Sequence, residues 1–317
     1  MKNAVISGTG SYLPARQLSN AELETTLDTT DAWIFSRTGI SSRRIAAAHE
    51  TTSFMASAAA KSALESSGVD VNDVDLILVA TCTPDHFFPS MACHVQQALA
   101  IPRSIPAFDI GAACSGFVYA MDIAKQYIAT GAARHVLVVG SECMSKAVDW
   151  ADRATCVLFG DGAGAVVLSA SDKPGIIASV LHAAFDQDKL LTYANDTLDD
   201  KKTVIDMRGN EVFKLAVNIM GDIVDEVLAA SNLKKSDIKW LVPHQANIRI
   251  IKAIAKKLSL PMSQVIVTIE HHGNTSAASI PLALDISVRE QCIKRGDLLL
   301  LEAFGGGMTW GAMVVRY

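Results

Sequence analysis

The sequence predicts an α/β protein built from two similar halves, and two observations lead to that fold class. Short, continuous apolar segments, typical of strands buried on both faces, alternate with longer apolar helical segments along the chain. The order of these segments also repeats, and the glycine-rich stretch at 159–168 resembles the stretch at 305–315. We therefore favour a duplication, with halves at 1–173 and 174–317, over chance enrichment in glycine.

The composition is that of a globular protein with a large core. The chain has 317 residues, of which 50% are hydrophobic and 19% are charged, and its net charge of −5 gives no general attraction to nucleic acid. Its six cysteines include no Cys-x-x-Cys pair, which argues against a disulfide framework or a zinc site. The first residues lack a signal-peptide pattern, and no apolar run is long enough to cross a membrane. We therefore expect a cytoplasmic protein without a membrane or nucleic-acid partner.

In the first half, apolar runs predict strands and amphipathic runs predict helices. A Ser-x-x-Glu capping box at Ser19 and Glu22 begins a short helix, and Gly68 ends a longer one. The predicted strands are Ala4–Gly8, Leu76–Thr81, Ile105–Ile110, His135–Gly140 and a glycine-broken strand within 157–169. The predicted longer helices are Thr52–Ser67, Ser90–Leu99 and an almost wholly apolar helix from Cys114 to about Thr130.

The second half follows the same pattern. The predicted strands are Ile176–Leu181, Trp240–His244, Val265–Ile269, Leu298–Glu302 and a last strand beginning near Gly311. The predicted helices are Asn210–Ser231, Ile248–Leu258 and a helix after Ala278. The polar segment Asp186–Lys202 predicts a surface loop that could act as a lid. Uninterrupted apolar strands favour largely parallel sheets covered by helices on both faces.

Cys114 is the first candidate for a chemical role. It follows a buried strand and a small-residue turn and opens the apolar helix, which ends at Gly131. Unpaired backbone N–H groups and the positive end of the helix dipole favour a thiolate at such a position, and the thiolate is the nucleophilic form. A small buried core cysteine is the alternative, and this stretch alone leaves both open.

Two further polar residues lie at predicted turns after strands. His244 follows Pro243 at a strand end, where sites form in α/β sheets, and Asn274 follows Gly273, which lets the backbone come close. The alternatives are a satisfied structural histidine and a turn-forming asparagine. A thiol nucleophile requires polar partners of this kind.

Three motifs together resemble a known family. They are Asp-Ile-Gly-Ala-Ala-Cys114-Ser-Gly-Phe, Val-Pro-His244-Gln-Ala-Asn247 and His-Gly-Asn274-Thr-Ser-Ala-Ala-Ser. Their order and full-length context resemble the β-ketoacyl-[acyl carrier protein] synthase III family, the initiating condensing enzymes of bacterial type II fatty acid synthesis. The resemblance implies a thiolase-like fold, with duplicated α/β halves in a five-layered αβαβα core, and a homodimer.

The resemblance also implies a mechanism. Cys114 would take the acyl group from acetyl-CoA, and malonyl-acyl carrier protein would then bind and lose CO2. His244 Nε2 and Asn274 Nδ2 would donate hydrogen bonds to the enolate oxygen, since such donors stabilise charge that appears only in the transition state. The N–H groups of Cys114 and Gly306 would hold the tetrahedral oxyanion. No metal or bound cofactor would be needed.

Further positions match the family one by one. The CoA contacts implied by the resemblance are Thr29, Trp33, Arg37, Arg153, Gly209, Phe213 and Asn247. Phe304 and Phe88, the latter lent by the partner subunit, would close the acyl pocket, and Met308 departs from the aromatic residue often found in the glycine loop. The implied acyl-carrier-protein contacts are Lys214, Gln245, Ala246, Asn247, Ile248, Arg249, Lys252, Lys256 and Lys257. A solvated basic helix face is the alternative for that last group.

Three other functions share parts of this pattern. A secondary-metabolite condensing enzyme would use the same Cys-His-Asn set, a noncatalytic homologue would only bind acyl-CoA or carrier protein, and a cysteine hydrolase would release free acid. The bulky Phe88 and the complete basic helix favour fatty acid initiation, and the intact triad opposes a noncatalytic role. The preferred primer chain length stays open at this point.

Overall fold

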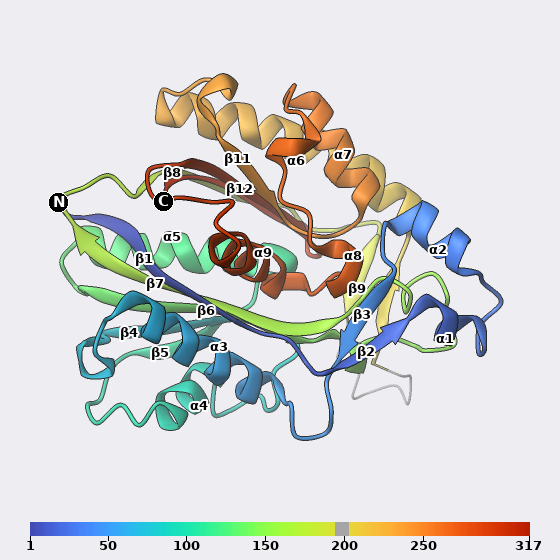
Figure 1. Cartoon of the computed structure of the whole chain (residues 1–317), viewed down its shortest axis with the longest axis horizontal. Coiled ribbons are helices and arrows are strands. Elements are labelled where there is room, and N and C mark those ends of the chain that lie inside the picture. Colours follow the sequence, from blue (N-terminus) through green and yellow to red (C-terminus); the bar gives the residue numbers. More distant parts are fainter. Residues whose placement is uncertain (194–202) are drawn as a thin grey trace.

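The computed structural model describes residues 1–193 and 203–317, and its two large β-sheets divide the chain in two (Figure 1). The first sheet has the order β1-β7-β6-β4-β5, and the second has the order β11-β12-β13-β8. The bounds in the first sheet are β1 Asn3–Tyr12, β4 Leu76–Ala80, β5 Ala107–Ile110, β6 His135–Cys143 and β7 Asp161–Ser171. The bounds in the second are β8 Ile176–Ala183, β11 Trp240–Pro243, β12 Leu298–Gly305 and β13 Thr309–Arg316.

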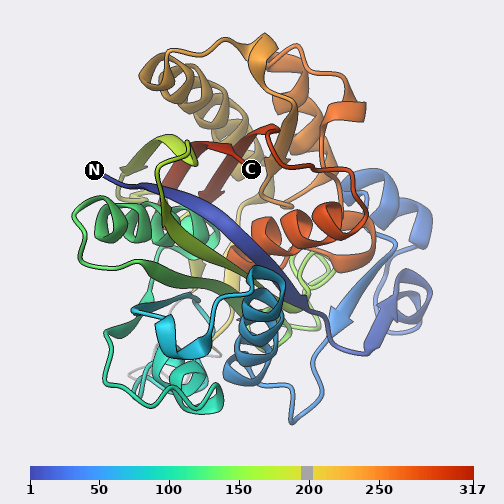
Figure 2. The same cartoon turned by 60° about the vertical axis from the view of Figure 1, so that its left-hand side comes forward.

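Helices form three layers around and between these sheets. Helices α5 (Gly116–Ala129) and α9 (Ser279–Arg289) lie between the sheets, where one apolar cluster joins both helices to both sheets (Figures 1 and 2). Helices α3 (Thr52–Ser67) and α4 (Met91–Ala98) cover the outer face of the first sheet. Helices α6 (Gly209–Ser231) and α7 (Ile248–Lys257) cover the outer face of the second. The five-layered αβαβα arrangement expected from the sequence is confirmed.

The sheets are mixed, so the prediction of largely parallel sheets is wrong. Strand β4 runs parallel to β5 and β6, and β11 runs parallel to β12. Strand β7 runs antiparallel to β1 and β6, and β13 runs antiparallel to β12 and β8. An unbroken apolar run reports burial on both faces, and helices bury antiparallel strands here as completely as parallel ones.

The predicted strand Val265–Ile269 is also wrong. Only one bridge, between Leu241 and Val265, joins it to the sheet. Backbone groups of this segment form hydrogen bonds with the Gln245 side chain instead. The Oε1 atom of Gln245 accepts from Thr268 N and Ile269 N, and its Nε2 donates to Ile266 O. An apolar segment whose backbone is satisfied by a side chain does not need a neighbouring strand.

Several short elements were not predicted individually. Strands β2 (Arg16–Ser19) and β3 (Ser42–Ile45) form a hairpin that encloses α1 (Asn20–Glu24) and α2 (Asp31–Thr38). The capping box predicted at the start of α1 is present. The short helix α8 covers Ile269–His272, and strands β9 (Leu191–Tyr193) and β10 (Ile205–Met207) pair with each other. The loop predicted at 186–202 lies only in part within the described residues.

Each half places a tight turn on the sheet of the other half. The 3-10 turn η2 (Ala113–Ser115) leads into α5, and η6 (Ser276–Ala278) leads into α9. Both begin at a residue with positive φ, 44° at Ala113 and 49° at Ser276. A methyl group on Gly140 of β6 would lie 2.3 Å from Ala277 O, and one on Gly305 of β12 would lie 2.6 Å from Cys114 N. Glycine within β6 and at the end of β12 therefore permits this crossed packing.

The predicted boundary at 173/174 falls between β7 and β8, the last strand of one sheet and the first of the other. An origin of the two halves by duplication stays a prediction. In the part of the chain that the structure describes, no helix is long and apolar enough to span a membrane.

Candidate active site

Cys114 lies in the turn η2 between β5 and α5, one step before the α-helix that the sequence predicted it to open. Thr309 of β13 holds this turn in place. Its Oγ1 donates to Ala112 O at 2.9 Å and accepts from Ser115 Oγ at 2.8 Å. The thiol is therefore positioned by a contact between the two halves of the chain.

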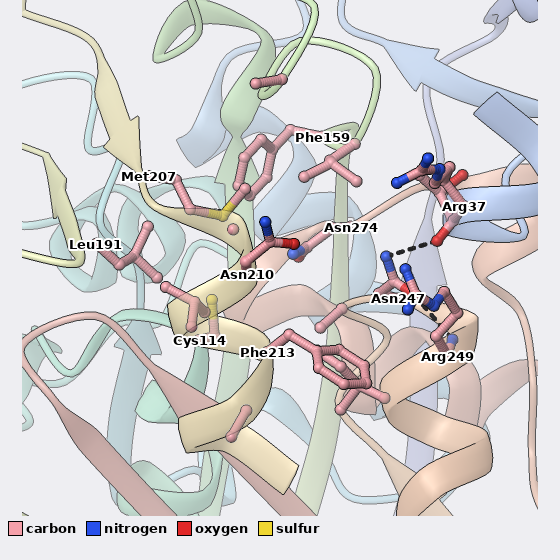
Figure 3. A pocket seen from close by; sticks show the side chains of 18 of the residues that line it. Arg37, Cys114, Phe159, Leu191, Met207, Asn210, Phe213, Asn247, Arg249 and Asn274 are labelled. Carbon is pink, nitrogen blue, oxygen red and sulfur yellow. Dashed lines mark hydrogen bonds between the residues drawn. The ribbon is translucent and has the colours of Figure 1, made fainter. Parts of the chain in front are cut away.

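A cavity of about 230 Å³ joins the three residues that the motifs singled out (Figure 3). Cys114, His244 and Asn274 all contribute to its wall, together with Phe304. Its remaining walls come mainly from α2, α6 and α7. From the predicted CoA and carrier contacts, the lining includes Trp33, Arg37, Gly209, Phe213, Ala246, Asn247 and Arg249.

His244 is a neutral imidazole held at the end of β11. Its backbone N–H donates to Glu302 O at 2.8 Å, which extends the β11–β12 pairing by one residue. The ring is only 5% exposed, and this burial lowers the pKa of His244 to about 3. Its Nδ1 is buried without a hydrogen-bond partner among the described residues. A neutral ring can donate from Nε2 without bringing a positive charge into the cavity.

The side chain of Asn274 is oriented by its own turn. Its Oδ1 accepts from Ser276 N at 2.8 Å, so the oxygen is engaged and the Nδ2 group is left to donate. Gly273 precedes it with φ 68°, and Asn274 N donates to Leu158 O at 2.8 Å. The turn-forming and functional interpretations of Asn274 are therefore compatible.

Burial raises the pKa of the Cys114 thiol to about 11, against a hydrogen bond from Ser276 that favours the thiolate. The nearby Glu142 carboxylate raises the pKa further. Burial and the Glu142 carboxylate therefore oppose the thiolate that the helix start was expected to favour. The turn lies among apolar side chains such as Phe159 and Leu191, which line the cavities beside Cys114. The nucleophilic role of Cys114 stays a prediction.

A second cavity, of about 490 Å³, also borders Cys114. Cys114, Phe159 and Leu191 line both cavities, and Gly306 lines the second. Its other lining residues include Cys82, Met144, Tyr193, Ile205 and Ser276. This mainly apolar space has the character of a site for a short acyl chain attached to the sulfur.

Phe88, which was predicted for the acyl pocket, and Met308, which departs from the family's glycine loop, line neither cavity next to Cys114. Phe88 is 86% exposed beside the exposed Phe87 and lines a separate surface hollow, and its role as a pocket residue lent by a partner subunit stays a prediction. Met308 is buried in the apolar cluster beneath α6 and lines neither cavity next to Cys114. The replacement of the family's aromatic residue by Met308 therefore changes the packing of the core and does not directly change the lining of either cavity.

Trp33 lines the first cavity, and two guanidinium groups lie close to its ring. The Arg37 Cζ atom is 5.5 Å from the ring centroid and the Arg153 Cζ atom is 5.4 Å from it. Arg153 and Thr29 do not line the cavity itself. Arg153 also forms an ion pair with Asp28 at 3.5 Å.

The basic residues of α7 divide into two groups. Arg249, Lys252 and Lys256 are exposed, and the Arg249 guanidinium lies 5.1 Å from the Phe213 ring at the cavity. Lys257 turns instead to α6, where its Nζ is 2.9 Å from Asp222 Oδ1. Lys257 therefore links the two outer helices while remaining partly exposed, and its role in carrier binding stays a prediction.

Other predicted carrier contacts have structural roles. Gln245 is 1% exposed and its amide is consumed by the backbone bonds described above, so its side chain cannot contact a partner protein. Asn247 caps α7 by accepting from Arg249 N at 2.8 Å and donates to Arg37 O at 3.1 Å. Ile248 faces Gly39, and Lys214 is exposed on α6.

Sequence reasoning missed three polar residues beside Cys114, namely Cys82, Glu142 and Ser276. The Cys82 sulfur is 3.1 Å from Glu142 Oε1 and 3.8 Å from Ser276 Oγ. A signal was available, because Cys82 follows β4, which runs parallel to β5, the strand that leads to Cys114. Residues after neighbouring parallel strands meet at one sheet edge.

Comparisons with known proteins agree with this geometry. Residues 108–184 match the family described as 3-oxoacyl-[acyl-carrier-protein (ACP)] synthase III, and residues 228–317 match its C-terminal family. The chain is 56% identical over 314 residues to β-ketoacyl-[acyl-carrier-protein] synthase III of Thiobacillus denitrificans, with 98% of each chain covered. It is 54% identical to the Coxiella burnetii protein of that name, with both chains fully covered.

Solved structures give the same result. The 3-oxoacyl-[acyl-carrier-protein] synthase III of Aquifex aeolicus superposes with a TM-score of 0.95 at 49% identity, covering 99% of this chain and 100% of that one. The fold and the buried Cys-His-Asn site define a condensing acyltransferase of the thiolase fold. Within that class, the chain belongs to the β-ketoacyl-[acyl-carrier-protein] synthase III family.

The depressed pKa of His244 predicts that its ring stays neutral throughout the physiological range. Because burial moves the pKa from 6.5 to about 3, lowering the pH from 8 to 5 should not protonate this imidazole. We expect its NMR signals, assigned by their loss in His244→Gln, to stay constant over that range. A change in the signals centred near pH 6.5 would show that the ring is solvated and able to carry charge.

Proposed function

We propose that this chain condenses a short acyl-CoA, acetyl-CoA in the simplest case, with malonyl-acyl carrier protein to give 3-oxoacyl-acyl carrier protein, CoA and CO2. The observation that carries the proposal is the convergence of Cys114, His244 and Asn274 on one buried cavity. Identities of 54–56% over the full length of named synthase III proteins favour this reaction over the noncatalytic and hydrolytic alternatives.

In the first half-reaction, Cys114 Sγ attacks the thioester carbonyl and keeps the acyl group. The N–H groups of Cys114 and Gly306 would donate to the tetrahedral oxyanion, because both residues line the cavity beside the sulfur. The absence of a Cβ at Gly305 supports this role by letting the end of β12 come close to Cys114 N. The acyl chain would occupy the second cavity, with Phe304 on the wall of the first cavity beside Cys114 and Phe88 reaching in from a partner subunit.

In the second half-reaction, malonyl-carrier protein loses CO2 and forms an enolate. His244 Nε2 and Asn274 Nδ2 would each donate a hydrogen bond to the enolate oxygen. The neutral His244 ring and the engaged Asn274 Oδ1 support this assignment, since both groups are then fixed donors. The enolate carbon attacks the acyl group, and Cys114 leaves as a thiolate. We propose that no metal or resident cofactor takes part, because these groups supply the donors that the reaction requires.

The first cavity would admit the pantetheine arm of either substrate. Gly209, Phe213 and Asn247 line it, and Trp33, with Arg37 and Arg153 on its ring, marks its mouth. Guanidinium and indole planes stack well on an adenine base, which supports CoA recognition there. Thr29 lies just before α2 and would contact the nucleotide from the same side. We also propose that the protein is a homodimer located in the cytoplasm.

The carrier protein would dock on α7. Arg249, Lys252 and Lys256 form an exposed basic surface next to the cavity, and Lys214 and Ala246 extend it. An acidic carrier would be attracted to this surface on an otherwise acidic protein.

The first prediction concerns the nucleophile. Incubation with acetyl-CoA should acylate Cys114 alone among the six cysteines, because it is the thiol that lines both cavities with the oxyanion donors. Intact-protein mass spectrometry followed by peptide mapping measures this. Acyl groups on Cys82 or Cys292 with an unmodified Cys114 would contradict the proposed function.

The second prediction separates the half-reactions. His244→Ala and Asn274→Ala should each slow malonyl decarboxylation on the order of 10²–10³-fold, the usual cost of losing one oxyanion donor. Acylation of Cys114 should remain measurable in both, since neither side chain is assigned to that step. Release of labelled CO2 from malonyl-carrier protein measures the first effect and mass spectrometry the second. Wild-type decarboxylation in both variants would overturn the role assignment.

The third prediction concerns docking. Reversing charge at Lys252 and Lys256 together should raise KM for malonyl-carrier protein and leave acylation by acetyl-CoA nearly unchanged, because neither residue lines the cavity. Added salt should weaken wild-type docking in the same direction. The matched control is Lys61→Glu with Lys173→Glu, an equal charge change at exposed residues away from α7. If the double variant lost the same share of activity in both half-reactions, the basic surface would be needed for folding rather than for docking.

A further inference from the structure

The backbone of Asn274 is held at the cavity wall by a short pairing with the segment 157–160. Asn274 N donates to Leu158 O at 2.8 Å, and Gly160 N donates to Asn274 O at 3.0 Å. Phe159 and Asn274 form a parallel bridge, and both residues line the first cavity (Figure 3). The place of Asn274 in the site therefore depends on where this segment lies.

Arg43 of β3 is a fully buried arginine that binds the same segment. Its Nη2 atom donates to Val157 O at 2.8 Å and to Asn20 Oδ1 at 2.9 Å. Its Nη1 atom donates to Leu18 O of β2 at 3.1 Å. The guanidinium group therefore ties the segment that pairs with Asn274 to the β2–β3 hairpin.

The aliphatic stem of Arg43 also packs against both members of this pairing. A methyl group on Gly160 would lie 3.1 Å from Arg43 Cβ, and one on Gly273 would lie 3.0 Å from the same atom. One of these glycines belongs to the supporting segment, and the other directly precedes Asn274. Arg43 thus supports the pairing through its stem as well as through its donors.

The chemistry of this position favours an anchoring role. Burial lowers the pKa of Arg43 to about 10, so the guanidinium is still a cation at neutral pH although the surroundings disfavour its charge. A shorter neutral side chain would avoid that cost. It could not reach the oxygen atoms of Leu18, Asn20 and Val157 together, which the long, forked side chain of arginine does.

We propose that Arg43 is a positioning residue for Asn274 in malonyl decarboxylation. By holding Val157 O it fixes the segment 157–160 and, through the pairing, the amide that donates to the enolate oxygen. Arg43 lines neither cavity next to Cys114, so it acts through Asn274. The inference rests on the proposed role of Asn274. Thr309 holds the Cys114 turn through separate contacts, so acylation does not depend on Arg43.

The test compares the two half-reactions of Arg43→Gln at saturating substrate. We expect kcat for malonyl decarboxylation to fall about tenfold and the rate of Cys114 acylation to change by less than about twofold, because a small displacement of a catalytic group is costly only in the step that uses it. Labelled CO2 release and mass spectrometry measure the two rates. Wild-type decarboxylation, or an equal loss in both half-reactions, would overturn the proposal.

A second comparison places the same change in Asn274→Ala. If Arg43 acts through the Asn274 amide, Arg43→Gln should slow decarboxylation little further once that amide is absent. A second loss of about tenfold would show that Arg43 acts elsewhere and would overturn the inference. Wild-type decarboxylation in Asn274→Ala alone would instead count against the proposed function. The two failures are therefore distinguishable.

Arg44→Gln is the matched control, because it makes the same charge change at the next residue of β3. The Nη1 atom of Arg44 donates to Pro14 O at 3.3 Å and to Ala15 O at 3.4 Å, and neither acceptor lies in the segment 157–160. Both half-reactions should stay near their wild-type rates. A loss of decarboxylation equal to that of Arg43→Gln would overturn the proposal in favour of a general effect of the hairpin.

Arg43→Met keeps the proposal testable if Arg43→Gln does not fold. Methionine retains an apolar stem next to both glycines and removes the buried charge, and such replacements are often tolerated. It still removes the donor to Val157 O, so the same difference between the half-reactions is expected. A folded Arg43→Met enzyme that decarboxylates malonyl-carrier protein at the wild-type rate would overturn the proposal.

Discussion

The active site depends on close packing between each half's turn and the other half's sheet. Gly140 lets η6 lie on β6, and Gly305 lets η2 lie on β12. At both positions a Cβ atom would clash with the backbone of the turn. The first contact holds the segment that follows Asn274, and the second holds Cys114. The spacing between nucleophile and amide is therefore determined by two packed sheets rather than by flexible loops, which is what preorganised catalysis requires.

This packing also removes water, and the electrostatics of the site follow from that. Burial lowers the pKa of His244 to about 3 and raises the pKa of Cys114 to about 11, so it favours the neutral form of both groups. A neutral donor suits decarboxylation, because it stabilises the enolate without first binding the malonyl carboxylate as a cation would. The same burial disfavours the Cys114 thiolate, because a charge on the sulfur would be poorly solvated there.

Local residue patterns predicted the elements that carry the chemistry. The bounds of α3 were predicted in full, and Cys114 and His244 lie within one residue of the helix start and the strand end predicted for them. The direction of β7 and β13 was not predictable, because apolar periodicity reports burial and not strand polarity. Gln245 was assigned to the surface by its motif, yet it satisfies backbone groups near Ile266, a role that only the folded chain reveals. Cys82 and Glu142 were missed because their neighbours are distant in sequence.

Ser276 shows why the nucleophile and the decarboxylating amide belong to one assembly. Its backbone N–H holds Asn274 Oδ1 and leaves Nδ2 to donate, while its side chain opposes the rise in the pKa of the Cys114 thiol and lines the second cavity with it. A single residue with φ 49° thus orients a donor for the second half-reaction and borders the cavity of the first. Positive φ is costly for a residue with a side chain. The same conformation at Ala113, beside Cys114, is consistent with one strained turn being used in each half.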